Sequence, residues 1–455
     1  MVGVRSELDE LLERALDHST ADQTEALYLG QDSALTRFAN NQIHQNVREH
    51  DASLQVRVID GERIGVAATN RLDEGGIRDV VERASAIAAR SAPNPRAALL
   101  PEPDGREHDP DLGYVAATAE AGADVRAEGA RAVIAAGEGK GLETSGSFST
   151  SVMTVAVANT RGVQVAHRST RASLLTVMMD GFASGAASGY ANAGAPDIGE
   201  IDAEALGAEA ARKGDDMRGA GELEQGEYEV ILEEYAVAGL LEYLSYIGFS
   251  GLAHEEGRSF MDLGKRVMGE NVAIWDDGSD PRGLPSPIDF EGVVRQRVDL
   301  IAEGVAAAVV HDTATGARAG TGSTGHGLPA PNLFGPMALN VFMGAGETPR
   351  DELIAGVKRG VWVTRFHYIN PVHPKKAILT GMTKDGTFLI TDGKLSRPLM
   401  NFRFTQSVPE AFSDVRAASR ETKLLPGEFF GAASAPALHL GSFNFTGVTA
   451  TEGGE

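Results

Sequence analysis

The fold of this chain is best predicted by starting from residues 228–260, YEVILEEYAVAGLLEYLSYIGFSGLAHEEGRSF. Its first residues, Tyr228 to Leu232, predict a short β-strand. The apolar run that follows is too long for a strand and predicts a helix. We therefore take this strand and helix as the stretch around which the chain is organised.

The same stretch ends in an adjacent His254 and Glu255. A helix with His and Glu side by side, and a second His one turn later, can hold zinc and place a general base beside the bound water. Here the positions that would supply the second imidazole are Arg258 and Ser259. His254 and Glu255 are therefore candidate catalytic residues of an incomplete motif.

Composition excludes several classes of function. The net charge of −23 argues against nucleic acid or an anionic membrane as the main partner, because those surfaces are themselves negative. The chain contains no cysteine, which removes disulfides, thiolate metal ligands and cysteine nucleophiles together. Neither a leader-like apolar run after a basic start nor an uncharged apolar segment of membrane-spanning length is found. We therefore expect a cytoplasmic protein.

The first half of the chain predicts an α+β layer. Helical spacing over residues 7–18 and 72–91 alternates with β-type runs at 25–29, 52–59 and 63–68, and Asp60-Gly61 is a hairpin signal. A helix at 114–136, a hairpin around 159–162 and a helix at 203–219 follow. This arrangement is typical of helices packed on one face of an antiparallel sheet.

The second half has a different pattern, with short β-type runs separated by Gly, Pro and Asp. Such runs predict a closed or nearly closed β-architecture with a few helices, including a short one at 351–357. The Gly-rich segment 219–226 is the best candidate for a boundary. The expected fold class is α+β, with an N-terminal α+β domain over residues 1–225 and a C-terminal, mainly β, barrel-like domain over residues 226–455.

Two further motifs favour structural interpretations. Residues 320–325 match the dinucleotide pattern G-x-G-x-x-G, but Pro329 and Pro331 follow at once, so no helix opens to face a pyrophosphate and a loop is expected. Asp289 and Glu291 stand two residues apart, which suits acid–base or metal chemistry, yet beside Gly292 a polar turn is the better interpretation.

The remaining histidines offer weaker metal candidates. His367 and His373 flank Asn370-Pro371, and His326 lies in the Gly-rich loop. Together with His254 they could form a metal site, but spacing alone does not bring them together, and a single His is more often structural or exposed. We therefore keep His254, His367 and His373 as candidate metal ligands only.

A set of segments in a fixed order carries more information than any single motif. The first is Thr36-Arg-Phe-Ala-Asn-Asn-Gln-Ile-His-Gln45. The others, which run along nearly the whole chain, are 158–162, 226–244, 257–260, 289–292, 300–304, 331–346, 352–354, 360–363, 391–394 and 397–398. In this combination the chain resembles the TldD/PmbA family of zinc metallopeptidases.

The resemblance implies a two-subunit particle. The TldD-like subunit carries H-E-x-x-x-H and a later Cys that together hold the metal, whereas the TldE or PmbA subunit lacks them. With Ser259 in place of the second His and no Cys, this chain is closest to the PmbA/TldE-type subunit. The resemblance therefore implies a non-catalytic subunit with no cofactor of its own, zinc in a TldD-like paralogue that completes a heterodimer, and small or unfolded peptides as substrates.

Two alternatives stay open. In the first, the chain is a self-sufficient metallopeptidase that uses His254 and Glu255 with an imidazole such as His367 or His373. In the second, it is an adaptor that binds peptides without cleaving them.

Overall fold

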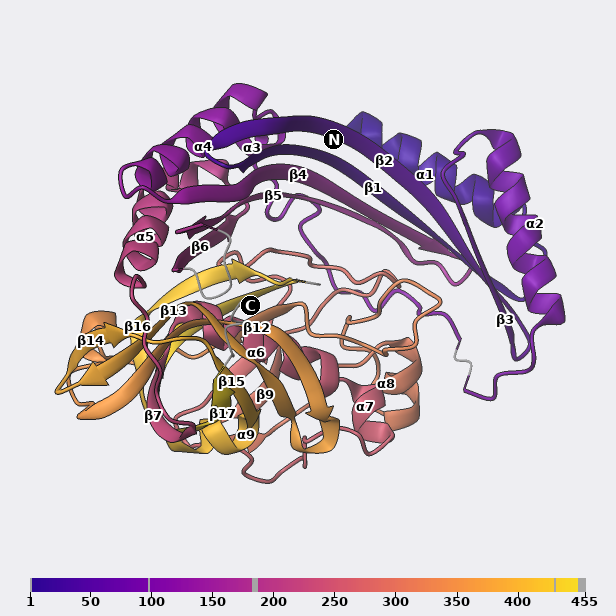
Figure 1. Ribbon diagram of the computed structural model, residues 1–455. Helices are drawn as coiled ribbons and strands as arrows, with labels where there is room; N and C mark the ends of the chain where they lie inside the picture. Colours follow the sequence, from indigo (N-terminus) through magenta and orange to yellow (C-terminus); the bar gives the residue numbers. More distant parts are fainter. Residues whose placement is uncertain (1, 97–98, 182–186, 429–430, 449–455) are drawn as a thin grey trace, which may run out of the picture.

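Two β-sheets form the framework of the protein, and Figure 1 shows one of them arching over the other. The computed structural model describes residues 2–96, 99–181, 187–428 and 431–448. The expected α+β class with a C-terminal barrel is confirmed. The domain boundary at 225/226 stays a prediction, although the second sheet begins at Gly226.

The first sheet has six antiparallel strands in the order β3-β2-β1-β4-β5-β6. The hairpin signal at Asp60-Gly61 is confirmed, because Asp60 pairs with Arg63 across the β2–β3 turn. The strands are β1 (Gln23–Ala39), β2 (Gln42–Asp60), β3 (Arg63–Thr69), β4 (Glu143–Asn159), β5 (Gln164–Met179) and β6 (Ser188–Ala195).

Helices cover one face of this sheet. Alternation along the strands places Ala26, Val56 and Ala156 against α1 and α2, and Phe148 and Leu174 against α4 and α5. The opposite face contacts the second half of the chain, where Leu27 and Val157 pack on Ile288. The helices are α1 (Val2–Asp17), α2 (Glu74–Arg90), α3 (Ala116–Ala119), α4 (Ala123–Glu138) and α5 (Ala203–Asp216).

Five strands of the second sheet close into a barrel. They lie in the order β17-β15-β13-β12-β7, and the first and last of this series, β17 and β7, also pair with each other. Phe366, Phe404 and Phe443 pack together in its core, with ring centroids 4.4–5.5 Å apart. The barrel strands are β7 (Gly226–Leu232), β12 (Arg359–His373), β13 (Ile378–Thr391), β15 (Phe402–Ser407) and β17 (Ala432–Val448).

Shorter elements extend this sheet and flank it. The strands are β8 (Ile274–Asp276), β9 (Val298–Ala302), β10 (Val305–Ala306), β11 (Asn340–Met343), β14 (Lys394–Pro398) and β16 (Val415–Pro426). The helices are α6 (Glu234–Ile247), α7 (Gly251–Glu255), α8 (Thr313–Ala319) and α9 (Val408–Ala411). The predicted strand and helix of residues 228–260 are β7 and α6, and α6 packs against β12 and β17.

Some predicted elements differ from the structure. The helix expected at 351–357 is only a 3-10 turn, Arg350–Glu352. The single helix expected at 114–136 is split into α3 and α4. The barrel strands extend beyond their apolar residues. Pairing with neighbouring strands satisfies the backbone N–H and C=O groups of polar residues as well, and these residues show no hydrophobic periodicity in the sequence. In the described part of the chain, no helix is long and apolar enough to span a bilayer.

Candidate functional site

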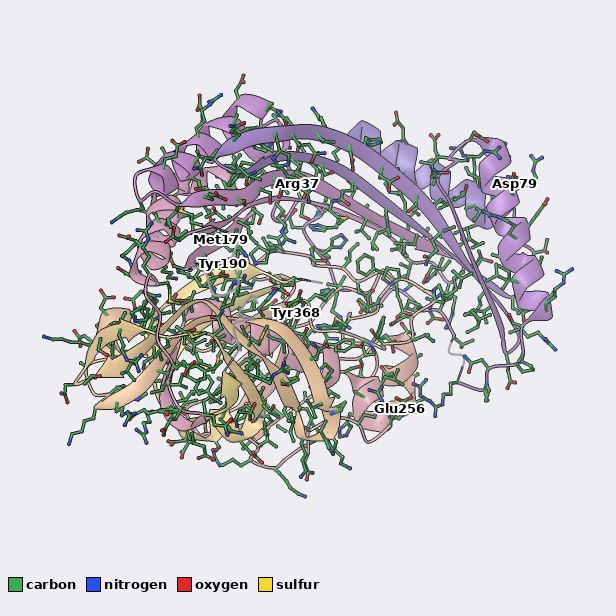
Figure 2. All side chains as sticks on the ribbon, viewed as in Figure 1. Arg37, Asp79, Met179, Tyr190, Glu256 and Tyr368 are labelled. Carbon is green, nitrogen blue, oxygen red and sulfur yellow. The ribbon has the colours of Figure 1, made fainter. Side chains whose placement is uncertain are left out.

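A cavity of about 390 Å³ lies beside α6, between the edge strand β6 of the first sheet and the barrel. Its volume is in the range of small-molecule pockets. Figure 2 shows Tyr190 of β6 and Tyr368 of β12 in the region between the arched sheet and the barrel. Residues of five segments far apart in sequence line the cavity, among them Tyr190, Asn192, Tyr235, Gly239, Glu242, Tyr243, Tyr246, Met337, Arg365, Phe366, Leu425 and Glu428.

Helix α6 supplies one whole wall of the cavity. The spacing of Tyr235, Gly239, Glu242 and Tyr246 places them on one face of the helix, because residues three, four and seven apart share a face. The opposite face, with Val237, Leu240, Leu241 and Leu244, is buried in the core of the second half. The helix is therefore fixed by apolar burial while its mixed face lines the cavity.

A tyrosine from strand β6 and a tyrosine from helix α6 meet at the cavity wall. The rings of Tyr190 and Tyr235 stand edge to face, with centroids 5.2 Å apart. Burial raises the pKa of Tyr190 to about 12 and raises the pKa of Tyr235 well above its usual value. Both phenols are therefore neutral at physiological pH, and each can donate and accept a hydrogen bond.

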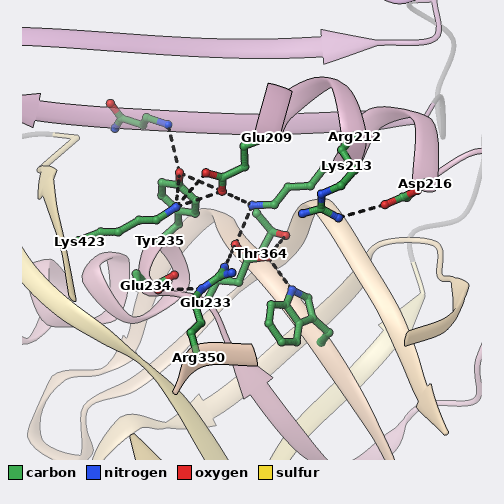
Figure 3. Close-up of polar contacts among 12 residues, drawn as sticks. Glu209, Arg212, Lys213, Asp216, Glu233, Glu234, Tyr235, Arg350, Thr364 and Lys423 are labelled. Carbon is green, nitrogen blue, oxygen red and sulfur yellow. Dashed lines mark hydrogen bonds and ion pairs between the residues drawn. The ribbon is translucent and has the colours of Figure 1, made fainter. Parts of the chain in front are cut away.

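A buried ionic network lies directly behind Tyr235 (Figure 3). The Glu233 carboxylate accepts from Lys213 Nζ at 2.6 Å and from Arg350 Nη2 at 3.1 Å. It also accepts from Trp362 Nε1 at 2.5 Å and from Thr364 Oγ1 at 2.8 Å. Burial opposes the charge, but the attraction of Lys213 and Arg350 outweighs it and lowers the pKa of Glu233. The network ties α5 to the start of α6 and to the barrel.

The network also positions the Tyr235 hydroxyl. Lys423 Nζ donates to it at 3.0 Å, and the hydroxyl in turn donates to Glu209 Oε1 at 3.2 Å. Glu209 accepts a further bond from Lys213 at 2.8 Å. Because α5 and β16 each contribute a partner to this residue of α6, the Tyr235 ring is held in one orientation at the cavity wall.

Arg365 is the cation nearest to the cavity, and its charge is already paired. Its guanidinium binds Asp385 Oδ2 at 2.5 and 2.6 Å and lies 4.3 Å from the centre of the Tyr190 ring. Asp385 is fully buried and accepts a second bond from Ser188 of β6 at 2.6 Å. Glu428 lies farther from the guanidinium, at 4.0 Å.

The predicted His254–Glu255 pair lies outside this cavity, on the five-residue helix α7. His254 is exposed, and its Nδ1 lies 3.1 Å from the carbonyl oxygen of Met261. Glu255 is bound by Arg318, whose hydrogen bond lowers the pKa of the carboxylate. Ser259 is buried, donates to the Gly248 carbonyl at 2.5 Å and accepts from the Met261 amide at 2.9 Å.

The other candidate ligands lie on β12. His367 is half-buried, which lowers the pKa of its imidazole, and His373 is exposed at the end of the strand. Among the residues that the structure describes, no three His, Asp or Glu side chains gather into a group that could hold a metal ion. The assignment of His254, His367 and His373 stays a prediction.

The two motifs interpreted as structural occupy loops and turns. Asp289 is fully buried and accepts from the amides of Glu291, Val293 and Gly327. Burial, together with the neighbouring Glu291 charge, raises its pKa to about 7. Glu291 binds Arg57 of β2, so this turn joins the two halves of the chain. The Gly-rich segment 320–325 follows α8 and opens no helix.

Comparison with known proteins identifies the family. Family models described as PmbA/TldA metallopeptidase domain 1, central domain and C-terminal domain match residues 25–88, 113–218 and 225–447, respectively. The chain belongs to the PmbA/TldD family. The resemblance drawn from the sequence is thereby confirmed.

Individual relatives of this PmbA/TldD family chain are distant. A metalloprotease PmbA homologue of Haemophilus influenzae is 26% identical over 339 residues, which cover 71% of this chain and 75% of the relative. A metalloprotease TldD homologue of Buchnera aphidicola is 27% identical over 193 residues, which cover 40% and 38%. The crystal structure of TldE from Thermococcus kodakarensis superposes with a TM-score of 0.87 at 21% identity, covering 97% of this chain and all of that one, and shows the same fold.

The names of these PmbA/TldD relatives imply a metal, and the donors around His254 do not fit one. A catalytic zinc site needs three protein ligands. Here one imidazole stands beside a carboxylate paired with Arg318 and a serine whose hydroxyl is bonded to backbone. The arrangement can position the turn after α7, but it offers no third ligand.

The cavity residues of this family member leave little trace in the sequence. Within residues 228–260, the local motif points to His254 rather than to Tyr235, Glu242 and Tyr246. The one available signal was the polar and aromatic spacing within an otherwise apolar helix. Nothing in the sequence indicates that Tyr190 or Glu428 lies against that helix.

Proposed function

We propose that this chain is the TldE/PmbA-type, non-catalytic subunit of a heterodimeric zinc metallopeptidase that acts on small or unfolded peptides in the cytoplasm. In this proposal the zinc belongs to a TldD-like paralogue. The observation that carries the proposal is the donor set around His254, where Ser259 bonds to backbone and Arg318 holds Glu255.

The cavity beside α6 gives this subunit a role beyond completing the particle. It lies next to β6, which is the edge strand of its sheet, and it is walled mainly by apolar and aromatic side chains. An extended peptide can be held along a sheet edge, with side chains placed in adjoining pockets. The subunit would then help to hold the peptide while the partner supplies the metal chemistry.

The test separates the two subunits. The chain is purified alone and with a TldD-like paralogue, zinc is measured by elemental analysis, and peptide cleavage is followed with and without a chelator. We expect no stoichiometric zinc and no cleavage for the chain alone, and chelator-sensitive cleavage for the mixture. Stoichiometric zinc with chelator-sensitive cleavage by the isolated chain would show instead that it is a self-sufficient metallopeptidase.

The cavity also favours a second candidate, an adaptor that binds peptides without cleavage. The same mixture discriminates between them. If the isolated chain binds peptides but addition of the paralogue produces no hydrolysis, the adaptor role replaces the heterodimeric peptidase.

A further inference from the structure

We infer that the cavity beside α6 binds a large apolar side chain carried next to a positive charge, such as an aromatic residue beside an ammonium or guanidinium group. This inference rests on the proposed peptide-binding role and names the kind of peptide group that the cavity accepts. Three features of the cavity support it: a rigid aromatic wall, an unused hydrogen-bond acceptor and an excess of carboxylates.

The wall is apolar and held in place from behind. Phe366 packs against Phe404 and Phe443 in the barrel core, at centroid distances of 4.4 and 5.5 Å. Tyr190 and Tyr235 are held by Arg365 and by the Lys423–Glu209 pair. A large apolar group that enters would be desolvated without any cost of ordering these rings, and aromatic contacts add to the effect of burial.

The cavity contains an acceptor without a donor. Asn192 is 7% exposed, lines the cavity, and its side-chain oxygen has no hydrogen-bond partner among the residues that the structure describes. A buried polar atom without a partner is costly, so a ligand N–H that reaches it is favoured. A ligand that offers only acceptors could not satisfy this oxygen.

Carboxylates outnumber available cations around the cavity. Glu242 and Glu428 both line it, and Glu242 accepts a hydrogen bond from the Glu428 amide at 3.0 Å. The nearby guanidinium of Arg365 is bound to Asp385 at 2.5 Å, much closer than its 4.0 Å distance from Glu428. Burial and the Glu242 charge raise the pKa of Glu428 against the opposing effect of Arg365. A cationic ligand would relieve this repulsion, and an anion would increase it.

The positive charge could come from a free peptide amino terminus or from a basic side chain, and the probes distinguish these sources. Binding to the isolated full-length chain is measured by calorimetry with four compounds. Phenylalaninamide carries a ring and an ammonium group, and N-acetylphenylalaninamide carries the ring alone. N-acetyl-Phe-Lys-amide moves the charge to a side chain, and N-acetylphenylalanine is an anion.

We expect at least one cationic probe to bind about tenfold more tightly than the neutral amide, as a hydrogen bond to a charged group allows. The anion should bind most weakly. A preference for phenylalaninamide would indicate the amino terminus, and a preference for the lysyl probe would indicate a side chain. Equal binding of cationic and neutral probes, or no binding by any probe, would overturn the inference.

Two variants locate the binding to this cavity. A Cβ built on Gly239 meets only Ile369 Cδ1, at 3.5 Å, so Gly239→Leu should place its side chain in the cavity and abolish binding. Glu428→Gln should remove the cationic preference, whereas Glu82→Gln on the exposed face of α2 should leave it unchanged. Thermal melts verify folding, and if Gly239→Leu fails to fold, Glu428→Gln still decides the matter.

Unchanged affinity in a folded Gly239→Leu variant would show that the probes bind elsewhere, which contradicts the inference. The measurement uses the isolated chain and requires no hydrolysis. Loss of selectivity here therefore leaves the heterodimeric peptidase untouched, and failure of the cleavage test leaves the ligand class untouched.

Discussion

Lys213 Nζ lies 2.6 Å from Glu233 Oε2, and the two side chains are only 2% and 1% exposed. This contact joins the last helix of the first half, α5, to the junction of β7 and α6. Both charged groups are buried away from water, so each is stabilised only by the other and by the surrounding hydrogen bonds.

Replacing Lys213 by Met should lower the free energy of unfolding by about 3–5 kcal/mol, because it removes one partner of a buried carboxylate. Urea denaturation measures the change. Lys140→Met is the matched control, since Lys140 pairs with Asp215 at 2.9 Å on the surface and should contribute less than about 1 kcal/mol. Similar losses in the two variants would contradict the importance of the buried pair.

Acid should weaken the network through Glu209. Burial opposes ionisation of Glu209, but Lys213 and Lys423 outweigh it and lower its pKa to about 2. A carboxylate whose folded pKa lies below its unfolded value of 4.5 stabilises the protein fully above that unfolded value, and this contribution is lost as the pH falls toward 2.

The contribution is on the order of 3 kcal/mol from the size of the shift. We expect wild type to be more stable than Glu209→Gln at pH 7, and the difference to shrink between pH 5 and pH 3 in urea denaturation. A difference that stays constant over this interval would show that Glu209 does not titrate as its surroundings indicate.

Arg57 should be as important for stability as Lys213, because it joins the first sheet to the second half of the chain. It binds Glu25 at 2.6 Å and Glu291 at 3.1 Å, and all three side chains are at most 16% exposed. Arg57→Met should cost about 3–5 kcal/mol because two buried carboxylates lose their cation.

Denaturation of Arg57→Met is compared with that of Arg78→Met, whose residue forms an exposed pair with Glu74 along α2. If the Arg57 variant is no less stable than the Arg78 variant, the ion pairs of Arg57 contribute nothing measurable to stability.

His254→Ala tests the proposed division of labour between subunits. His254 is exposed and makes one hydrogen bond to a carbonyl, so the change should cost less than about 1 kcal/mol and leave cleavage by the two-subunit mixture unchanged. Ser259→Ala is the contrasting variant, because its buried hydroxyl holds two backbone groups and its loss should cost about 1–3 kcal/mol. Loss of cleavage in a folded His254→Ala complex would assign a catalytic role to this imidazole.

Local signals predicted the elements whose patterns are self-contained. The strand and helix of residues 228–260 follow from an apolar run of sufficient length, and the β2–β3 hairpin follows from Asp60-Gly61, where Gly61 adopts a φ of +57°. The closed barrel was predicted as a class from the short β-type runs. Its closing strand, β17, was not, because pairing between strands far apart in sequence leaves no local pattern.

The candidate site could not be predicted for the same reason. The cavity exists because Tyr190 of β6, Tyr235 of α6 and Arg365 of β12 meet in space. Each is unremarkable in its own segment. The His-Glu pair was conspicuous in sequence because its motif is local, but its surroundings, Arg318 and the Gly248 carbonyl, come from elsewhere in the fold.

The closure of the barrel also fixes an order of events during synthesis. Gly226 of β7 pairs with Phe445 of β17, so the first strand of the second half waits for a strand that is made much later. At translation rates of about 5–20 residues per second, the unfinished barrel remains open for roughly ten to forty seconds. The nascent second half, with its apolar helix already made, would therefore be a natural client for chaperones until β17 has been made and the barrel closes.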